Sequence, residues 1–385
     1  MAINLKERPI FVIGHERSGT TLLMAMLGHH KRIAVPEVGW LFPRFYPYLY
    51  THGDLNQEEN LRTLADEMLF GLNHNLWGMD LNPRNAVDEI LSEVKERSFA
   101  GIYCAMHERF AKENGNKPRW GQKTPHNLYF VGPILECFPN AQFIFIVRDG
   151  RDAATDYLES AFGPTNIFCA AESWKLSWNA VKPWREKLDS STWMDITYED
   201  LVRQPEQMVQ KVCDFLGEDY DPAMLDFWKG EIGQARGQTR DHKPLGHAVS
   251  DKYIGIHKRL LSIRDQEVFT AVAGKELEEA GYENSVKPCE ITPEDEALYR
   301  EKDGRVRTAL LDSPGGHILF ESYRDWLVDQ REARKRKGLW DDSQYGKVWP
   351  EGDPYEELII GYGAWKKWKD HFSVKRQYTA KGVVF

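Results

Sequence analysis

The sequence predicts an α/β fold in which a central parallel sheet is flanked by helices. Three observations support it: short apolar runs of strand length, helical patterns between those runs, and a glycine-bearing loop that joins the first run directly to a helix. Alternating strands and helices of this kind are typical of parallel sheets that are covered on both faces. The length of 385 residues and the hydrophobic content of 42% suit one main domain with a sizeable appendage.

The first predicted strand is the apolar run PIFVIG at residues 9–14, which suits a strand that is buried on both faces. After a short loop comes TTLLMAML at residues 20–27, which contains neither Gly nor Pro and is rich in helix-forming residues. Strand, loop and helix therefore follow one another directly, as in the first half of a βαβ unit.

Three further strands are expected later in the chain. RWGQKT at 119–124 and QFIFIVR at 142–148 are the clearer patterns, and TWMDIT at 192–197 is a weaker one. A helix is then expected to begin at Pro205, with apolar residues at helical spacing, and to stop at Gly217.

Two other regions lie outside this alternating pattern. Residues 56–114 are dominated by helical patterns and predict a helical insertion, one face of which carries Leu61, Leu64, Met68 and Leu72. The main domain is expected to span residues 1–283, and residues 284–385 are expected to form an extension that packs on it.

The extension has two compositional features. Its basic run at residues 331–337 is interpreted as a solvated helix face, with an anion-binding role as the alternative. Its late aromatic residues suggest that it packs on something, and they include Trp340, Trp349, Trp365 and Trp368.

Composition narrows the classes of partner and compartment. A formal net charge of -9 argues against a general nucleic-acid or anionic-membrane binder. The five cysteines are scattered and lack paired spacing, so we expect a reducing compartment and no structural zinc. The first apolar run is far shorter than a membrane span or a signal-peptide core, which favours a cytoplasmic protein. A homo-oligomer is possible.

The segment GHERSGTT, from Gly14 to Thr21, joins the first strand to its helix. Successive backbone amides and the helix dipole at such a junction create a site for a phosphate-like anion. The segment nearly fits the nucleotide-binding pattern G-x-x-x-x-G-K-S/T, but Thr20 stands where that pattern requires lysine, and the positive charge appears earlier, at Arg17. A tight turn that needs Gly and Ser for backbone reasons alone is the alternative interpretation.

A second group of charged residues lies in FIFIVRDGR, where a predicted buried strand delivers Arg148 to its carboxyl end and Arg151 follows. Ligands of open parallel sheets bind at those carboxyl ends. Two guanidinium groups there could hold a phosphate by charge-assisted hydrogen bonds, unless carboxylates such as Asp149 and Asp152 pair with them.

Together, GHERSGTT and IVRDGRDAATDY resemble the loop that binds the 5′-phosphosulfate and the strand that binds the 3′-phosphate in the sulfotransferase family. Three other stretches occur in the family's usual order: WGQKTPHN, YEDLVRQPEQMVQKVCDFLG and KYIGIHKRLLS. The resemblance covers roughly residues 8–283. It implies a fold like that of the P-loop NTPases, with 3′-phosphoadenosine 5′-phosphosulfate (PAPS) as donor and adenosine 3′,5′-bisphosphate (PAP) as product.

By position, the resemblance also assigns donor-binding roles. It places Arg148 at the 3′-phosphate and Tyr198 near the adenine, with Lys258 and Arg259 as weaker candidates for the 3′-phosphate end. The residues that it places around the 5′-phosphosulfate are Arg17, Ser18, Gly19, Thr20 and Thr21.

One position departs from the family pattern. The family usually places a serine that bonds the 3′-phosphate eight residues after the strand arginine, and here that position is Asp156. A carboxylate at this point would repel the phosphate. Thr155 offers a neighbouring hydroxyl, although one residue along a helix rotates a side chain by about 100°.

Sulfuryl transfer needs an in-line approach, a neutralised leaving group and an acceptor that loses a proton, with little covalent work for the protein. Arg17 and Lys123 are the candidates for stabilising charge on the departing phosphate, and no metal is required. For the base we expect Glu37, since the resemblance places an acidic residue near this point in some branches; His126 and His15 are the alternatives.

Two other functions remain open from the sequence. One is a P-loop kinase, although Thr20 in place of lysine counts against it; the other is a nucleotide-binding protein of the same fold that has lost activity. The acceptor is expected to be a hydroxyl or amine of a small molecule or glycan, in a pocket that is partly apolar or ring-binding because of aromatic residues such as Trp40, Phe42, Tyr46 and Tyr48.

Overall fold

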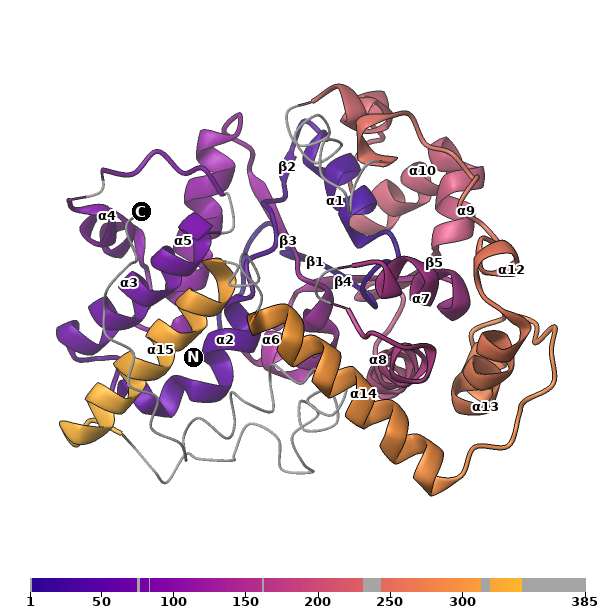
Figure 1. Ribbon diagram of the computed structural model, residues 1–385. Coiled ribbons are helices and arrows are strands. Elements are labelled where there is room, and N and C mark those ends of the chain that lie inside the picture. Colours follow the sequence, from indigo (N-terminus) through magenta and orange to yellow (C-terminus); the bar gives the residue numbers. More distant parts are fainter. Residues whose placement is uncertain are drawn as a thin grey trace.

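The computed structural model describes residues 2–74, 77–82, 84–160, 163–230, 244–312 and 319–340. At the centre of this part of the chain lies a five-stranded parallel sheet in the order β2-β3-β1-β4-β5, which confirms the predicted fold class (Figure 1). The strands are β1 (Ile10–Ile13), β2 (Ile33–Ala34), β3 (Arg119–Lys123), β4 (Gln142–Val147) and β5 (Trp193–Thr197). Sequence patterns predicted all of them except β2, which is too short to show a pattern.

Alternating side chains of β1 face opposite sides of the sheet and build two cores. Phe11 and Ile13 belong to one buried cluster, whereas Ile10 and Val12 belong to the other. A strand that is buried on both faces has a continuous run of apolar residues, which is why the run PIFVIG predicted this strand clearly.

The smaller core is covered by helices that follow β1 and β5. The prediction for one of them is confirmed: it begins at Pro205 and ends at Gly217, whose φ of 73° is the left-handed conformation that glycine adopts easily. The elements on this face are α1 (Thr20–Gly28), α9 (Tyr198–Arg203), α10 (Pro205–Leu216) and η3 (Pro222–Lys229).

The larger core lies under the remaining helices of the main domain. Three of these fall in the predicted insertion at residues 56–114, and the apolar face predicted there is buried. The elements are α2 (Leu41–Phe45), η1 (Tyr46–His52), α3 (Glu58–His74), α4 (Ala86–Glu93), α5 (Phe99–Glu113), η2 (Pro125–Phe130), α6 (Val131–Cys137), α7 (Gly150–Leu158), α8 (Ile167–Lys187) and α13 (Ile263–Glu279).

Beyond this core, α12 (His257–Leu260) packs on α7, and α14 (Pro293–Asp312) and α15 (Leu319–Arg336) follow it in the chain. Figure 1 shows α14 and α15 running in succession along one side of the molecule, from α8 to α3. The ring of Tyr299 on α14 stacks on Phe168 of α8 at 5.1 Å, and Trp340 packs edge-on against Tyr50. Trp349, Trp365 and Trp368 lie outside the described residues.

The basic run at residues 331–337 is only partly a solvated face, and the prediction is wrong for two of its arginines. Arg331 is fully buried, with its guanidinium 4.2 Å from the Tyr48 ring, and Arg334 is ion-paired with the buried Glu67 of α3. These arginines are three positions apart on the helix, so they share one face. The sequence of the run could not show that a carboxylate from α3 would meet that face.

None of the helices in the described part of the chain combines the length and the apolar character that crossing a membrane requires.

Candidate active site at the carboxyl edge of the sheet

The carboxyl ends of the parallel strands bring the predicted site residues to one edge of the sheet. Their order across the sheet is therefore set by the strand order rather than by the sequence. From one side to the other the edge carries Glu37 after β2, Lys123 and His126 at and after β3, the loop of residues 14–21 after β1, Arg148 after β4, and Tyr198 after β5.

Close backbone approaches explain both glycines of this loop. A Cβ on Gly14 would lie 2.4 Å from the Ile146 carbonyl oxygen, and one on Gly19 would lie 2.7 Å from the Tyr198 ring. Gly19 also has a φ of 93°, and Arg17 has a φ of 65°, so the loop is tightly wound. Backbone packing alone therefore accounts for the glycines, as the alternative interpretation holds.

Packing does not account for Ser18. Its side chain is fully buried, yet Oγ has no hydrogen-bond partner among the residues that the structure describes. Thr20 and Thr21 then open α1, whose N-terminus has no side-chain cap in this part of the chain. A buried hydroxyl and uncapped helix amides are groups that suit an anion.

The turn after β3 joins Glu37 to Lys123. Lys123 is buried at the end of β3, beside Val12 of β1. Next to it, Thr124 Oγ1 accepts hydrogen bonds from the backbone amides of Gly39 and Trp40, at 3.3 Å and 3.4 Å. The backbone carbonyl of Glu37 in turn accepts from the Gln122 side chain at 3.4 Å, so Glu37 is fixed beside the strand end that carries Lys123.

The two histidine candidates face different elements. His126 Nδ1 forms an ion pair with Glu16 Oε1 at 2.9 Å, and the His126 ring lies 4.6 Å from the Trp40 ring. His15 instead shares a hydrogen bond of 3.2 Å with Ser173 of α8 and meets the Tyr157 ring edge-on. Burial lowers the pKa of His15.

Sequence reasoning missed Glu16, although this residue lies in the quoted loop. A charged residue between His15 and Arg17 gives no sign of which element it will meet, because its partner His126 lies in η2, which follows β3 far along the chain. Only the adjacency of β1 and β3 in the sheet brings the two together.

Arg148 is almost completely enclosed. Its Nη1 donates to the Arg17 carbonyl at 2.8 Å and to Asp156 Oδ2 at 2.6 Å, and its Nη2 donates to the Tyr253 carbonyl at 3.1 Å. The guanidinium also lies over the Tyr198 ring, 4.6 Å from its centre. Asp156 thus occupies a position on Arg148 where the resemblance places a 3′-phosphate.

The other groups near this end are also engaged. Arg151 pairs in two-point fashion with Asp149, at 2.9 Å and 2.7 Å, as the alternative interpretation of this arginine required. The Thr155 hydroxyl donates to the Arg151 carbonyl of its own helix at 2.8 Å. Asp152 binds the Gly255 amide and His257, which ties α12 to α7.

Tyr198 is placed between the loop and Arg148, at the beginning of α9. Burial raises its pKa to about 12, so the phenol is neutral near physiological pH and cannot serve there as a base. Lys258 and Arg259 lie exposed on α12, the helix that Asp152 ties to α7.

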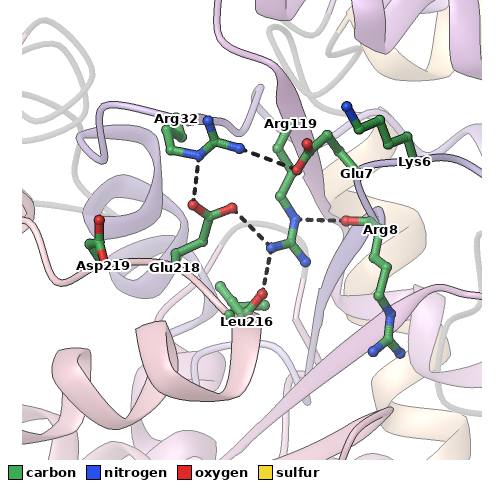
Figure 2. A pocket seen from close by; sticks show the side chains of 9 residues that line it. Lys6, Glu7, Arg8, Arg32, Arg119, Leu216, Glu218 and Asp219 are labelled. Carbon is green, nitrogen blue, oxygen red and sulfur yellow. Dashed lines mark hydrogen bonds and ion pairs between the residues drawn. The ribbon is translucent and has the colours of Figure 1, made fainter.

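A cavity of about 430 Å³ opens at the opposite, amino edge of the sheet and is also rich in arginine (Figure 2). There Arg119 donates to Glu218 and to the backbone carbonyls of Arg8 and Leu216, while Arg32 pairs with Glu7 and Glu218. Figure 2 shows these groups turned toward one another, which is the arrangement of an internal ion-pair network.

The model of a family described as the sulfotransferase family matches residues 9–222. A solved structure, the sulfotransferase domain of the Synechococcus PCC 7002 olefin synthase, aligns with a TM-score of 0.50 at 21% identity, covering 74% of this chain and 99% of that domain. At this identity the likeness concerns the fold.

Two curated relatives are similar over most or half of the chain. An uncharacterised protein of Aquifex aeolicus is 24% identical over 300 residues, which are 73% of this chain and 35% of that protein. A protein-tyrosine sulfotransferase of Drosophila melanogaster is 26% identical over 226 residues, 57% of this chain and 40% of that protein. The matched parts thus span well under half of either relative's length.

Proposed function

The chain belongs to the sulfotransferase family, and on that premise we propose that it moves a sulfuryl group from PAPS to an acceptor hydroxyl or amine, releasing PAP. The observation that carries this proposal is the loop after β1. Its Ser18 hydroxyl is buried without a partner in the described part of the chain, beside an uncapped helix N-terminus. These groups suit the 5′-phosphosulfate end of the donor.

The strand order gives the reaction a direction. Arg148 and Tyr198 follow β4 and β5 on one side of the loop, so the nucleoside end of the donor belongs there. Glu37 and His126 follow β2 and β3 on the other side, so the acceptor would approach from there. The sulfur lies between them, near the end of β1, as an in-line displacement requires.

In the transfer step the bond between sulfur and the phosphate oxygen breaks as the bond between sulfur and the acceptor oxygen forms. Negative charge then develops on the phosphate, and Arg17 and Lys123 are the cations that we assign to it. Lys123 is buried, which strengthens such an interaction by excluding water.

The acceptor's proton must go to a base on the β2–β3 side. Glu37 and His126 are both buried there, and both are tied to the turn after β3. His15 is directed toward Ser173 and Tyr157, so we do not assign it this role.

We propose a hydroxyl on an aromatic ring as the first acceptor to test. The Trp40 ring beside His126 offers a flat apolar surface to such a ring. The similarity to a protein-tyrosine sulfotransferase points the same way, and a tyrosine-containing peptide would be a larger acceptor than the small molecules or glycans considered from the sequence.

Calorimetry with PAP and with ATP tests the donor assignment. We expect PAP to bind more tightly than ATP and without magnesium, because the loop carries Thr20 where a kinase would carry lysine. Tighter, magnesium-dependent ATP binding would support the kinase instead. PAP binding without transfer of labelled sulfate to any peptide, phenol, sugar or amine would indicate a protein that binds the nucleotide without catalysis.

A further inference from the structure

The phosphate loop carries a carboxylate that the proposed reaction has not yet used. Glu16 and His126 form an ion pair at 2.9 Å, and both residues are buried. Building on the proposed function, we infer that Glu16 is a positioning residue that holds His126 as the general base, so that His126 rather than Glu37 removes the acceptor's proton.

The surrounding elements restrict the orientation of the His126 ring. The Trp40 ring lies 4.6 Å from its centre and the Tyr129 ring lies 6.0 Å from it. Glu16 contacts Nδ1, the ring nitrogen nearer the backbone. The ring thus contacts two aromatic groups and, at Nδ1, a carboxylate, and Nε2 is the nitrogen to which we assign the acceptor's proton.

Charge at this position favours the same arrangement. Burial alone would raise the pKa of Glu16, but the charge and close contact of His126 outweigh it, so the pKa of Glu16 lies below its usual value and the side chain is a carboxylate at neutral pH. A carboxylate facing Nδ1 favours the tautomer with hydrogen on Nδ1, which leaves the lone pair on Nε2. His15 is the other titratable group that acts on Glu16, and it too lowers the pKa of this carboxyl.

The chemistry of the step follows from this tautomer. As the acceptor oxygen forms its bond to sulfur, its proton passes to Nε2 of His126, and the imidazolium that results is stabilised by Glu16. The sulfuryl group leaves the phosphate oxygen of the donor, which keeps the bonding electrons, and His126 later returns its proton to water. Glu16 itself keeps its charge throughout.

The placement of Glu16 also couples the base to the donor. Glu16 lies two residues before Ser18, in the loop that we assign to the 5′-phosphosulfate. One short, tightly wound segment therefore carries both the groups that we assign to the 5′-phosphosulfate and the group that orients the base.

The first test measures turnover of a phenolic acceptor as a function of pH. We expect His126→Ala to lower kcat by roughly a hundredfold or more, the usual contribution of a general base, and Glu37→Gln to lower it less. Glu16→Gln should lower kcat roughly tenfold or more and shift its acid-side decline to lower pH, because an amide stabilises the imidazolium less well. Glu16→Asp should retain more activity than Glu16→Gln, since it keeps the carboxylate.

Two control variants distinguish a loss of His126 orientation from a general loss of folded structure. Glu159→Gln makes the same charge change at an exposed position after α7 and should leave kcat unchanged. Combining Glu16→Gln with His126→Ala should cost little more than His126→Ala alone, since Glu16 acts through the histidine. Affinity for PAP should stay within about twofold of wild type in every variant.

A readout without turnover completes the test. Nitrogen NMR of labelled histidine should find the Nδ1–H tautomer of His126 in the wild type and a shift toward the Nε2–H tautomer in Glu16→Gln. An Nε2–H tautomer in the wild type, or normal kcat in Glu16→Gln, overturns the inference, as does a larger loss in Glu37→Gln than in His126→Ala. If no acceptor is sulfated, the proposed function itself fails, and the tautomer still decides whether Glu16 orients the ring.

Discussion

The two edges of the parallel sheet both carry buried arginines, but they differ in how completely their buried polar groups are paired. At the amino edge, Arg119 and Arg32 are satisfied by Glu218, Glu7 and backbone carbonyls, so the charges neutralise one another. At the carboxyl edge, polar atoms with no partner in the described part of the chain are buried, namely Ser18 Oγ, His15 Nδ1 and Arg148 Nε. Completed pairing indicates a scaffold, whereas an incomplete set of partners indicates a place for a ligand.

The carboxyl edge itself has one part in which buried polar groups lack partners and another part in which they are paired. Around the loop and the turn after β3, the buried groups suit an anion and a base. Toward β4, however, Arg148 is paired with Asp156 and Arg151 is paired with Asp149, much as the arginines of the amino edge are. The family's donor fits the 5′ end of the site better than the 3′ end, where the phosphate would have to compete with Asp156.

The largest effect that this comparison predicts is on stability, at the amino edge. Replacing Arg119 with Met removes the buried cation of this network: it leaves Glu218 with only the partly exposed Arg32 and takes the donor away from the carbonyls of Arg8 and Leu216, so we expect the free energy of unfolding to fall by about 3–5 kcal/mol. Turnover per folded molecule should stay near that of wild type. Denaturant unfolding together with kcat measured on the folded fraction checks both; a loss of turnover without a loss of stability would place the amino edge in the catalytic machinery.

For a cation of the carboxyl edge we expect a loss of turnover instead of a loss of stability. Lys123→Ala removes charge that we assign to the departing phosphate, and kcat should fall by roughly 10²–10³. The exposed Lys6, beside the amino-edge cavity, is the matched control, and Lys6→Ala should leave kcat unchanged. Steady-state kinetics on both variants decides the matter, and equal losses in the two would contradict a division between the edges.

The smallest predicted effect concerns the paired part of the carboxyl edge. Asp156→Ser removes a negative charge from Arg148 and supplies a hydroxyl, so PAP should bind roughly tenfold more tightly. Adenosine 5′-monophosphate lacks the 3′-phosphate and should bind with unchanged affinity, which calorimetry with both nucleotides can establish. Unchanged or weaker PAP binding would mean that the 3′-phosphate does not approach Asp156.

The extension shows that a run of basic residues does not by itself identify a solvated helix face. Residues 331–337 read as a solvated face, yet Arg331 and Arg334 are buried against η1 and α3. Whether a cation is solvated depends on the partner that folding brings to it. That partner, Glu67, belongs to a helix far away in the sequence.

The sequence by itself determined the parallel sheet, four of its five strands, the helix that stops at Gly217, and the family. These features are written in local patterns, because strand burial, helix period and loop geometry depend on residues that are close in the chain. The sequence also named most residues that the carboxyl edge gathers, since strand ends must share an edge.

Only the tertiary structure decided which charges meet. It paired Glu16 with His126, Asp156 with Arg148 and Glu218 with Arg119, and it left the Ser18 hydroxyl buried. An ion pair depends on distance and on the exclusion of water, and both are set by elements that join from remote parts of the chain. For this reason the sequence could only favour Glu37 over His126 and His15 as the base, whereas the fold gave His126 a carboxylate partner.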